Sequence, residues 1–493
     1  MRSSATQDVP ARDDLRRAGA RSALWQGLAF ALSKAAVLVT TVVLARLLAP
    51  EQYGLVALAL VFVAYAQTVA DAGVAQALVY LPRSSPTVRA AMSCALLVGV
   101  LLVAVAMVSA PLVAAFFQRP DVEPLVRLCA VSLLASSLGS VPDALLRRDL
   151  LFSRITVARV VSAVATGATS IGLAAAGAGP WAIAWGAVVG STVATVVSWI
   201  VLPVRPDALL WRTTRSDVRA VLAYGIPVAG ASLLGKFVFD ADYLVIGRQL
   251  GAEQLAYYTF AFKLPELVIL NVFFVLLSVT FPLFTHARSD PERLRRGYLF
   301  SIRLQSLYGV AAGVGLAVTA PLAVRVLFGE AWAPAAGALT ALALYAALRT
   351  IGGGANEVYK ALGRPGIPLV ISVIRLVVLV PVLLFATRWG IDGVAWAQVV
   401  LAAVFAIAMQ AVALHVLQLD ARRLLSALAP AASVAPAVAV VAGLLAHLPL
   451  PPALTLVVAV TGGGAAAVAV LLVAQPALVK DVIGLLCRRS VTT

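Results

Sequence analysis

Four ionisable side chains stand inside long apolar stretches of the sequence. Lys34, Lys236 and Arg375 are cations, and Asp240 follows Lys236 by one helical turn. A charge near the centre of a bilayer costs at least about 2.5–3.5 kcal/mol on insertion scales. Ammonium and guanidinium groups repay such a cost when they bind phosphate or pyrophosphate oxygens through charge-assisted hydrogen bonds. These residue types therefore predict a site for an anionic headgroup inside a membrane.

The four charges differ in the partners that the local sequence offers. Lys236 and Asp240 are spaced i, i+4 and can neutralise each other on one helix face, and Asp240 could instead couple transport to a proton or Na⁺. Lys34 and Arg375 have no acidic residue at i±3 or i±4. We expect these two cations to face a cavity, an anion or a partner on another helix. Asp242 points away from the face of Asp240 and is a weaker candidate.

Other charges in or near the apolar stretches have structural explanations. Lys263 and Glu266 form an expected i, i+3 pair beside Pro265, and Asp143 can pair with Arg147. Arginines near the ends of apolar spans are expected to extend their side chains toward lipid headgroups. This group comprises Arg127, Arg159, Arg303 and Arg349.

A short polar sequence occurs twice between apolar stretches, in "ARLLAPEQYG" and "GRQLGAEQLA". We call each one a hook; Arg46 and Glu51 of the first match Arg248 and Glu253 of the second, 202 residues later. A tight turn stabilised by an Arg46–Glu51 pair is one interpretation. A direct role of Arg46 and Arg248 in substrate binding is the alternative.

The composition shows which elements must position these residues. Of 493 residues, 62% are hydrophobic and only 12% charged, with a mean hydropathy of +0.98. Apolar stretches of about 20 residues predict transmembrane helices, since a helix satisfies its own backbone in lipid. The alternation typical of a membrane β-barrel is absent. The fourteen expected spans lie near 24–45, 55–79, 91–115, 124–146, 157–176, 181–203, 221–246, 256–284, 299–324, 335–358, 366–387, 391–416, 429–447 and 453–476.

The basic residues predict the orientation of these spans. The N-terminus and every second connector together hold 25 Lys and Arg, against 5 in the other connectors. This asymmetry places both termini in the cytoplasm. It also accounts for the net charge of +16 through contacts with membrane lipids, so nucleic acid is not an expected partner. We expect no metal and no cofactor, because no phosphate-binding loop and no clustered Cys or His occurs.

The repeated hook predicts an all-α polytopic protein built from two six-helix lobes. Lys34 falls on Lys236 at the same ungapped offset. Six crossings are an even number, so the second lobe enters the membrane in the orientation of the first, as parallel repeats. Two C-terminal helices complete the chain. The expected parts are a tail 1–21, an N-lobe 22–203, a linker 204–220, a C-lobe 221–416, two helices in 417–476 and a tail 477–493.

The first hairpin resembles the start of Wzx-type oligosaccharide flippases in the multidrug/oligosaccharidyl-lipid/polysaccharide flippase superfamily. The shared features are the hook, an Asp-x-Gly near the end of the next helix (Asp71 and Gly73), and "ALGR" within 356–369. The resemblance implies 12 to 14 helices in two lobes around a central cavity. It also implies transport of polyprenyl-pyrophosphate-linked glycans across the bacterial inner membrane, alongside glycosyltransferases and a polymerase.

Three rival functions make different demands on the sequence. A drug antiporter of the same superfamily should carry acids and aromatics in its cavity, whereas the charges in mid-span here are mostly positive. A membrane glycan polymerase or ligase needs a catalytic set in a sizeable outer loop, and the expected outer connectors are short. A scaffold without transport would have no reason to bear charges in the membrane.

Overall fold

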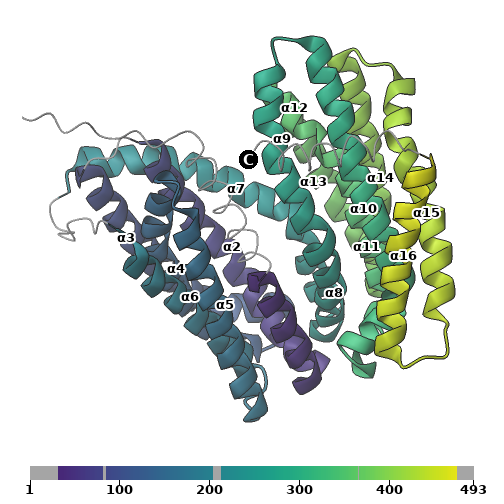
Figure 1. The fold of residues 1–493 in the computed structure, drawn as a ribbon. Coiled ribbons are helices and arrows are strands. Elements are labelled where there is room, and N and C mark those ends of the chain that lie inside the picture. Colours follow the sequence, from purple (N-terminus) through teal and green to yellow (C-terminus); the bar gives the residue numbers. More distant parts are fainter. Residues whose placement is uncertain (1–31, 82–84, 204–212, 365, 475–493) are drawn as a thin grey trace, which may run out of the picture.

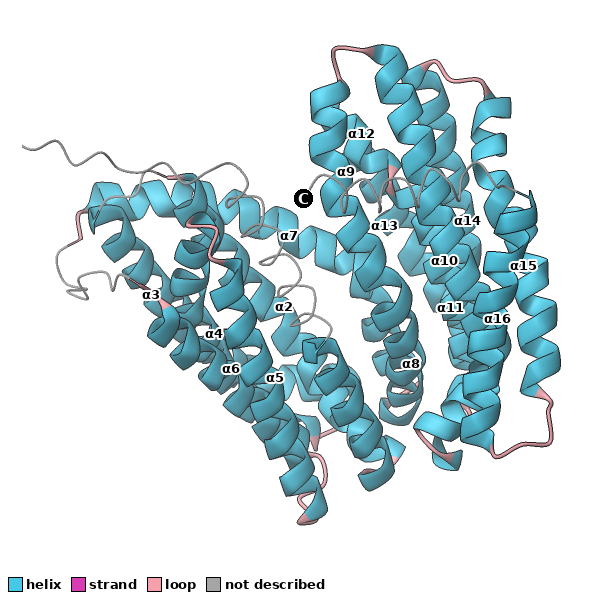
Figure 2. Ribbon diagram, in the orientation of Figure 1, coloured by secondary structure: helices cyan, strands magenta, loops and turns pink. Residues whose placement is uncertain are grey.

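The computed structural model describes residues 32–81, 85–203, 213–364 and 366–474, which form helices joined by short turns and contain no strand (Figure 2). Within these ranges, twelve helical stretches are long and apolar enough to cross a membrane, and the longest of them, Gly366–Leu417, contains two helices. The chain is therefore a multi-pass membrane protein. The expected tails 1–21 and 477–493 and the linker residues 204–212 lie outside the described residues.

The helices assemble into two groups (Figure 1). The first group begins with a helix at 32–47. It continues with α2 (Pro50–Tyr80), α3 (Ser85–Phe117), α4 (Val122–Arg148), α5 (Phe152–Ala175) and α6 (Trp181–Val201). Within it α4 packs on α2, α3 and α6, and α5 packs on α6.

The second group is built around α10 and α11. Helix α10 packs on α11 and α15, α11 also packs on α14, and α15 packs on α16. Its elements are α8 (Ala252–Pro265), η1 (Glu266–Leu270), α9 (Asn271–Ala287), α10 (Pro291–Leu327), η2 (Glu330–Trp332), α11 (Ala335–Gly353), α12 (Ala355–Ala361), α13 (Gly366–Ala386), η3 (Thr387–Trp389), α14 (Gly390–Leu417), α15 (Ala421–Ala446) and α16 (Pro452–Ala474).

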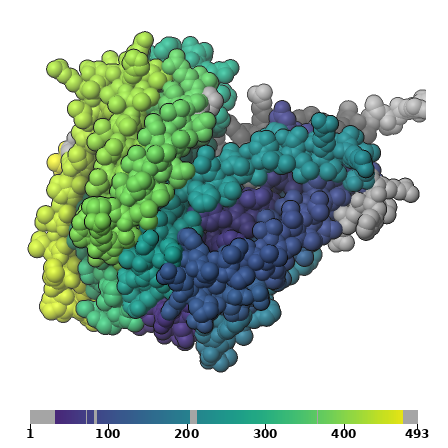
Figure 3. All heavy atoms as spheres, turned by 180° about the vertical axis from the view of Figure 1, so that it is seen from behind, coloured from purple at the N-terminus to yellow at the C-terminus, as the bar shows by residue number. Residues whose placement is uncertain are grey.

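Helix α7 (Arg215–Gln249) connects the groups, because it packs on α2 and α3 and also on α13. From behind, it is a teal band across the blue helices that reaches the green ones (Figure 3). Its start is capped by Thr214, whose hydroxyl accepts from the Asp217 amide. The helix therefore takes in the end of the expected linker 204–220. Where α7 crosses α2, a Cβ added at Gly225 would lie 2.6 Å from the carbonyl oxygen of Gly73, the glycine of the Asp-x-Gly motif. The absence of a side chain at Gly225 therefore allows the two helices to pack closely there.

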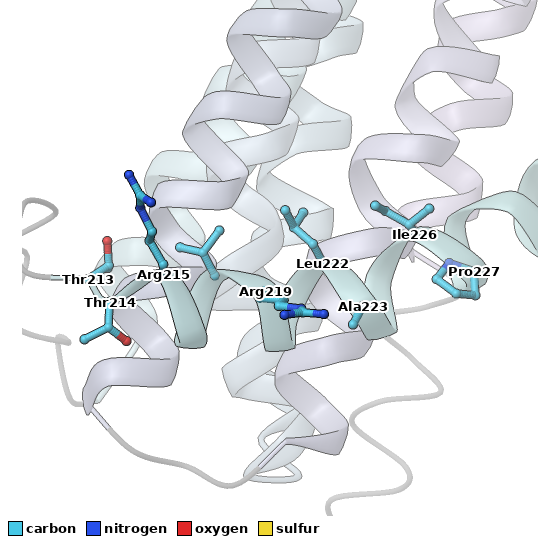
Figure 4. A pocket seen from close by; sticks show the side chains of 9 residues that line it. Thr213, Thr214, Arg215, Arg219, Leu222, Ala223, Ile226 and Pro227 are labelled. Carbon is cyan, nitrogen blue, oxygen red and sulfur yellow. The ribbon is translucent and has the colours of Figure 1, made fainter.

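The first half of α7 also forms a shallow hollow of about 640 Å³ (Figure 4). Arg215, Arg219 and Leu222 line it, together with Ile226 and Pro227. All its lining residues belong to one helix and the two residues before it. A single helix surrounds a ligand on one side only, so this hollow is not the strongest candidate for a binding site.

Candidate functional site

A polar cavity of about 980 Å³ lies within the first group. Its walls come from α2, α4, α5 and α6, with one residue from α7. It has the size of a small-molecule site, and its polar side chains are mostly hydroxyls and amides. These are Gln67, Thr68, Gln76, Ser132, Ser136, Ser140, Ser162, Thr166, Ser191, Thr195, Ser198 and Ser232.

Hydrogen bonds between helices hold the walls of this polar cavity. The Gln67 side chain donates to Ser136 Oγ at 3.0 Å, and Ser162 donates to the Gly190 carbonyl at 2.8 Å. The charged residues at its rim are Asp143, Arg147 and Arg159. Arg147 donates to Asp143 at 2.7 Å, which confirms the expected pair. Since hydroxyl and amide groups both donate and accept, such a cavity suits a ligand rich in hydroxyl groups.

A second, smaller cavity of about 140 Å³ lies in the second group and is lined by both Arg349 and Arg375. Arg349 donates to the Tyr345 hydroxyl at 2.9 Å, and its guanidinium lies 4.1 Å from the centre of the Phe239 ring. The expectation that Arg349 extends toward lipid headgroups is therefore wrong. Its guanidinium is held between α7 and α11 because an aromatic face and a phenol oxygen lie within reach there.

The expected pair of Lys236 and Asp240 is confirmed. The ammonium donates to the carboxylate at 2.5 Å, and both side chains are partly buried, with 24% and 30% exposure. The Lys236 ammonium also lies 5.6 Å from the centre of the Tyr65 ring on α2. Lys236 thus carries its counter-ion with it, which leaves less of its charge for an anionic ligand.

Asp242 is more deeply placed than its sequence position suggested. It is 4% exposed, accepts from Tyr258 at 2.6 Å and from the Gln398 amide at 3.0 Å, and joins α7 to α8 and α14. Its side chain turns away from Asp240, as expected, but into the protein core. Spacing along α7 could not reveal this, because the partners stand 16 and 156 residues away in the chain.

Lys34 stands where the two groups face each other. Glu266, Lys263 and Arg159 are among the charged groups within electrostatic range of its ammonium. Glu266 and Lys263 belong to the second group and form the expected pair, at 3.0 Å. Arg159 lines the polar cavity. Lys34 therefore lies near both the polar cavity and the second group, a position that its sequence left open.

The two hooks are tight turns that begin helices, as the first was expected to be. Pro50 is the first residue of α2, and the Gln52 side chain accepts from the Ala49 amide at 3.2 Å. Gly251 immediately precedes α8 and has a φ of +87°, a conformation that favours glycine. The two hooks therefore share sequence in part because each one contains the start of a helix, α2 in the first hook and α8 in the second.

The expected Arg46–Glu51 pair is wrong. Arg46 donates to the Val326 carbonyl at the end of α10, at 2.7 Å, and Glu51 pairs with Arg119. A carbonyl at a helix C-terminus lacks an intrahelical donor, so Arg46 satisfies it. Arg248 lies 5.7 Å from the centre of the Phe116 ring. Neither arginine lines the two cavities described above.

An aromatic cluster joins the two groups beside the hooks. It comprises Tyr53 of α2, Tyr257 and Phe260 of α8, and Phe328 and Trp332 near the end of α10. The Trp332 side chain is fully buried and donates to the Ala45 carbonyl at 2.8 Å. Aromatic pairs add about 0.5–1.5 kcal/mol beyond their buried area. This cluster closes the end of the molecule that carries the hooks, which we call the hook end.

The family described as "Polysaccharide biosynthesis protein" matches residues 43–337. The chain belongs to the polysaccharide biosynthesis protein family. Three curated relatives agree with this membership. They are the teichuronic acid biosynthesis protein TuaB of Bacillus subtilis (25% identical, 55% of this chain, 56% of that one), the lipopolysaccharide biosynthesis protein WzxC of Escherichia coli (25%, 74% and 75%) and the succinoglycan biosynthesis transport protein ExoT of Rhizobium meliloti (26%, 62% and 62%).

The matched part spans between about half and three quarters of these curated relatives of the polysaccharide biosynthesis protein family. Two solved structures share the fold. The lipid II flippase MurJ in an inward closed conformation is 13% identical, with a TM-score of 0.77 over 92% of this chain and all of that one. An inward-facing multidrug transporter of the MATE family is 16% identical, with a TM-score of 0.64 over 79% and 94%. The resemblance that the first hairpin shows is confirmed by the family match and the curated relatives, and the two solved structures add the shared fold.

Proposed function

We propose that this member of the polysaccharide biosynthesis protein family translocates polyprenyl-pyrophosphate-linked oligosaccharide across the bacterial inner membrane. The observation that carries the proposal is the polar cavity of about 980 Å³ inside a membrane protein of this family. A hydroxyl- and amide-lined cavity replaces the hydration of a glycan, which lipid cannot do. Two relatives are named for lipopolysaccharide biosynthesis and for succinoglycan biosynthesis and transport, which supports a role in polysaccharide biosynthesis. The polysaccharide proposed here is an exopolysaccharide, a capsule or an O-antigen.

The lipid tail stays in the bilayer while the headgroup crosses. No covalent bond is made or broken, so the protein acts as a transporter and not as an enzyme. Lys34 and Arg375 attract the pyrophosphate, with Lys236, Arg46 and Arg248 as further candidates from the sequence. Asp240 is the candidate for coupling to a proton or Na⁺. Glycosyltransferases supply the substrate and a polymerase consumes the product.

Alternating access moves the headgroup. In this mechanism the first group is the N-lobe, α7 to α14 form the C-lobe, and α15 and α16 are the two additional helices of a fourteen-helix protein. The hook end faces away from the cytoplasm. The hook end is closed, and the polar cavity extends from Leu60 to Val79 along α2, toward the opposite end. Rocking of the lobes would open the hook end and close the other. A reporter fused after Thr493 that is active only outside the cytoplasm should give no signal.

The main alternative is a drug antiporter of the same superfamily, and the polar cavity speaks against it. Among the described residues, its lining contains no aromatic side chain and a single carboxylate, which is paired with Arg147. Cationic drugs are recognised by aromatic faces and unpaired acids. A glycan polymerase is disfavoured because the described connectors on the hook side are short turns.

The decisive experiment follows the lipid-linked saccharide. In cells that lack this protein, the saccharide should accumulate on the cytoplasmic face of the inner membrane. Purified protein in sealed vesicles should restore access of a membrane-impermeant glycosidase to the labelled saccharide. Vesicles that leave the saccharide as protected as protein-free vesicles do would contradict the proposal.

A further inference from the structure

Two guanidinium groups that line the small cavity of the second group meet at one phenol oxygen beside it. Arg349 of α11 donates to the Tyr345 hydroxyl at 2.9 Å, and Arg375 of α13 donates to the same oxygen at 3.4 Å. No carboxylate lies within 4.0 Å of either guanidinium among the described residues. One phenol oxygen therefore serves two guanidinium groups. Asp242 lies within electrostatic range of Arg349 but does not line the cavity, whose described lining holds these two cations and no carboxylate.

The donors of these arginines are only partly used. The Arg375 Nε is buried and has no hydrogen-bond partner. An unpaired buried donor on a charged group is costly, so its persistence points to a partner that binds there. The Phe239 ring, 4.1 Å from the Arg349 guanidinium, and the Phe405 ring, 5.9 Å from that of Arg375, hold the two groups in place without neutralising them.

The size of the small cavity selects the ligand. Its volume of about 140 Å³ is several times the roughly 30 Å³ that one water occupies in the liquid. It has room for a small anion such as phosphate or diphosphate and not for an oligosaccharide. Arginine forks match phosphate oxygens two at a time. Two forks that line one cavity suit a group with several phosphate oxygens.

Helix α13 indicates where a lipid attached to this anion would lie. Its residues Pro368, Ile371, Ser372 and Arg375 line the small cavity at one-turn spacings. Leu369 and Val377, on its other face, are 57% and 67% exposed, as expected of a surface against hydrocarbon. A headgroup in the small cavity could thus keep its lipid chain along the outside of α13.

We propose that Arg349 and Arg375, whose guanidinium groups are positioned by the Tyr345 hydroxyl, bind the diphosphate of a polyprenyl diphosphate. This inference rests on the proposed function, because it assigns a place to the charged part of that substrate. It separates the tasks within the molecule: the second group holds the diphosphate, and the polar cavity of the first group remains for the glycan. Arg349, which its sequence position assigned to the membrane surface, becomes a substrate-binding residue.

Binding is tested on purified protein in detergent by calorimetric titration with farnesyl diphosphate. Saturable binding is expected, and farnesol should not compete, because it lacks the anion. Arg349→Gln and Arg375→Gln should each raise the dissociation constant about tenfold or more. Arg388→Gln is the matched control. Arg388 belongs to η3, lies against the Phe385 ring and does not line the small cavity. This variant should bind farnesyl diphosphate as tightly as the unmodified protein does. Tyr345→Phe should keep most of the affinity, because both cations remain.

Further arms make every outcome decisive. If inorganic pyrophosphate binds as tightly as farnesyl diphosphate, the anion site is supported but its ligand is a free diphosphate. That result would overturn the assignment of the site to a lipid. Competition by farnesol, or unchanged affinity in both arginine variants, would overturn the site. If a Gln variant does not fold, Arg349→Lys and Arg375→Lys keep the charge, lose the fork and should bind more weakly.

The vesicle assay tests the proposed function separately from this site. If the unmodified protein translocates the saccharide but both arginine variants bind farnesyl diphosphate with unchanged affinity, only the site is refuted. If the variants lose binding but the unmodified protein does not translocate, only the function is refuted.

Discussion

Gly54 of the first hook lies directly against the carbonyl group of Ala252 in the second. A Cβ added at Gly54 would stand 1.9 Å from the Ala252 carbonyl oxygen. Two segments that match each other 202 residues apart in the sequence thus meet in space. Glycine allows this approach because it has no side chain. The contact joins the starts of α2 and α8 and closes the hook end.

Cross-linking of the hooks should stop transport. With Cys94, Cys129 and Cys487 replaced by Ser, Pro50→Cys and Ala252→Cys place one thiol on each hook. A short crosslinker should hold the hook end closed, and cleavage of the crosslinker should restore translocation in vesicles. A direct disulfide needs Cα atoms within about 7 Å, so several crosslinker lengths should be compared. Efficient cross-linking with undiminished transport would show that the hooks do not separate.

Gly54→Val should force the two hooks apart. Inserting methyl groups into a packed contact typically costs about 1–3 kcal/mol, and here the obstacle is a backbone carbonyl that cannot rotate away. We expect easier labelling of a cysteine at Ala252 by an impermeant thiol reagent. Gly172→Val in α5 is the control, because a Cβ there meets nothing within 4 Å. Equal labelling in the two variants would contradict the role given to Gly54.

Trp332→Phe should loosen the aromatic cluster. The substitution leaves the Ala45 carbonyl without its donor, which costs about 1–3 kcal/mol, and it alters the ring contacts with Tyr53 and Phe260. The unfolding temperature in detergent should fall by several degrees. Trp389→Phe is the comparison. Because Trp389 is 63% exposed, this substitution should change the unfolding temperature little.

Lys236 and Asp240 should behave as a coupled pair in a double-mutant cycle. Asp240→Ala leaves the ammonium without its partner and should destabilise the protein by roughly 2 kcal/mol. Lys236→Met in the same chain should recover part of this loss, because no unpaired charge remains. Chemical unfolding in detergent measures all four variants. Strict additivity would show that the pair at 2.5 Å contributes nothing.

Lys34→Ala should abolish translocation while the protein still inserts and accumulates. Its charge lies within range of Arg159 at the polar cavity and of Glu266 in the second group. Lys34→Arg should retain part of the activity, since the positive charge stays. Arg288→Ala removes an exposed cation after α9 and serves as the control. Full translocation by Lys34→Ala would remove this residue from the mechanism.

Local spacing predicted the contacts made within a helix. The pairs Lys236–Asp240, Lys263–Glu266 and Asp143–Arg147 follow from one-turn intervals. Tyr345, four residues before Arg349, is the one local signal that could have marked that arginine, because the two residues share a helix face. The apolar stretches likewise predicted the helices, since a spanning segment must satisfy its own backbone.

Contacts between helices were decided by the tertiary structure alone. Arg46 reaches Val326 and not the nearby Glu51, and Asp242 bonds to Gln398, because packing brings distant segments together. The convergence of Arg349 and Arg375 depends in the same way on how α11 meets α13. A sequence determines by itself which segments enter the membrane and which charges share a helix face, since both depend on local periodicity. Which cation lacks a counter-ion depends on groups far away in the chain, and only the packed helices set their positions.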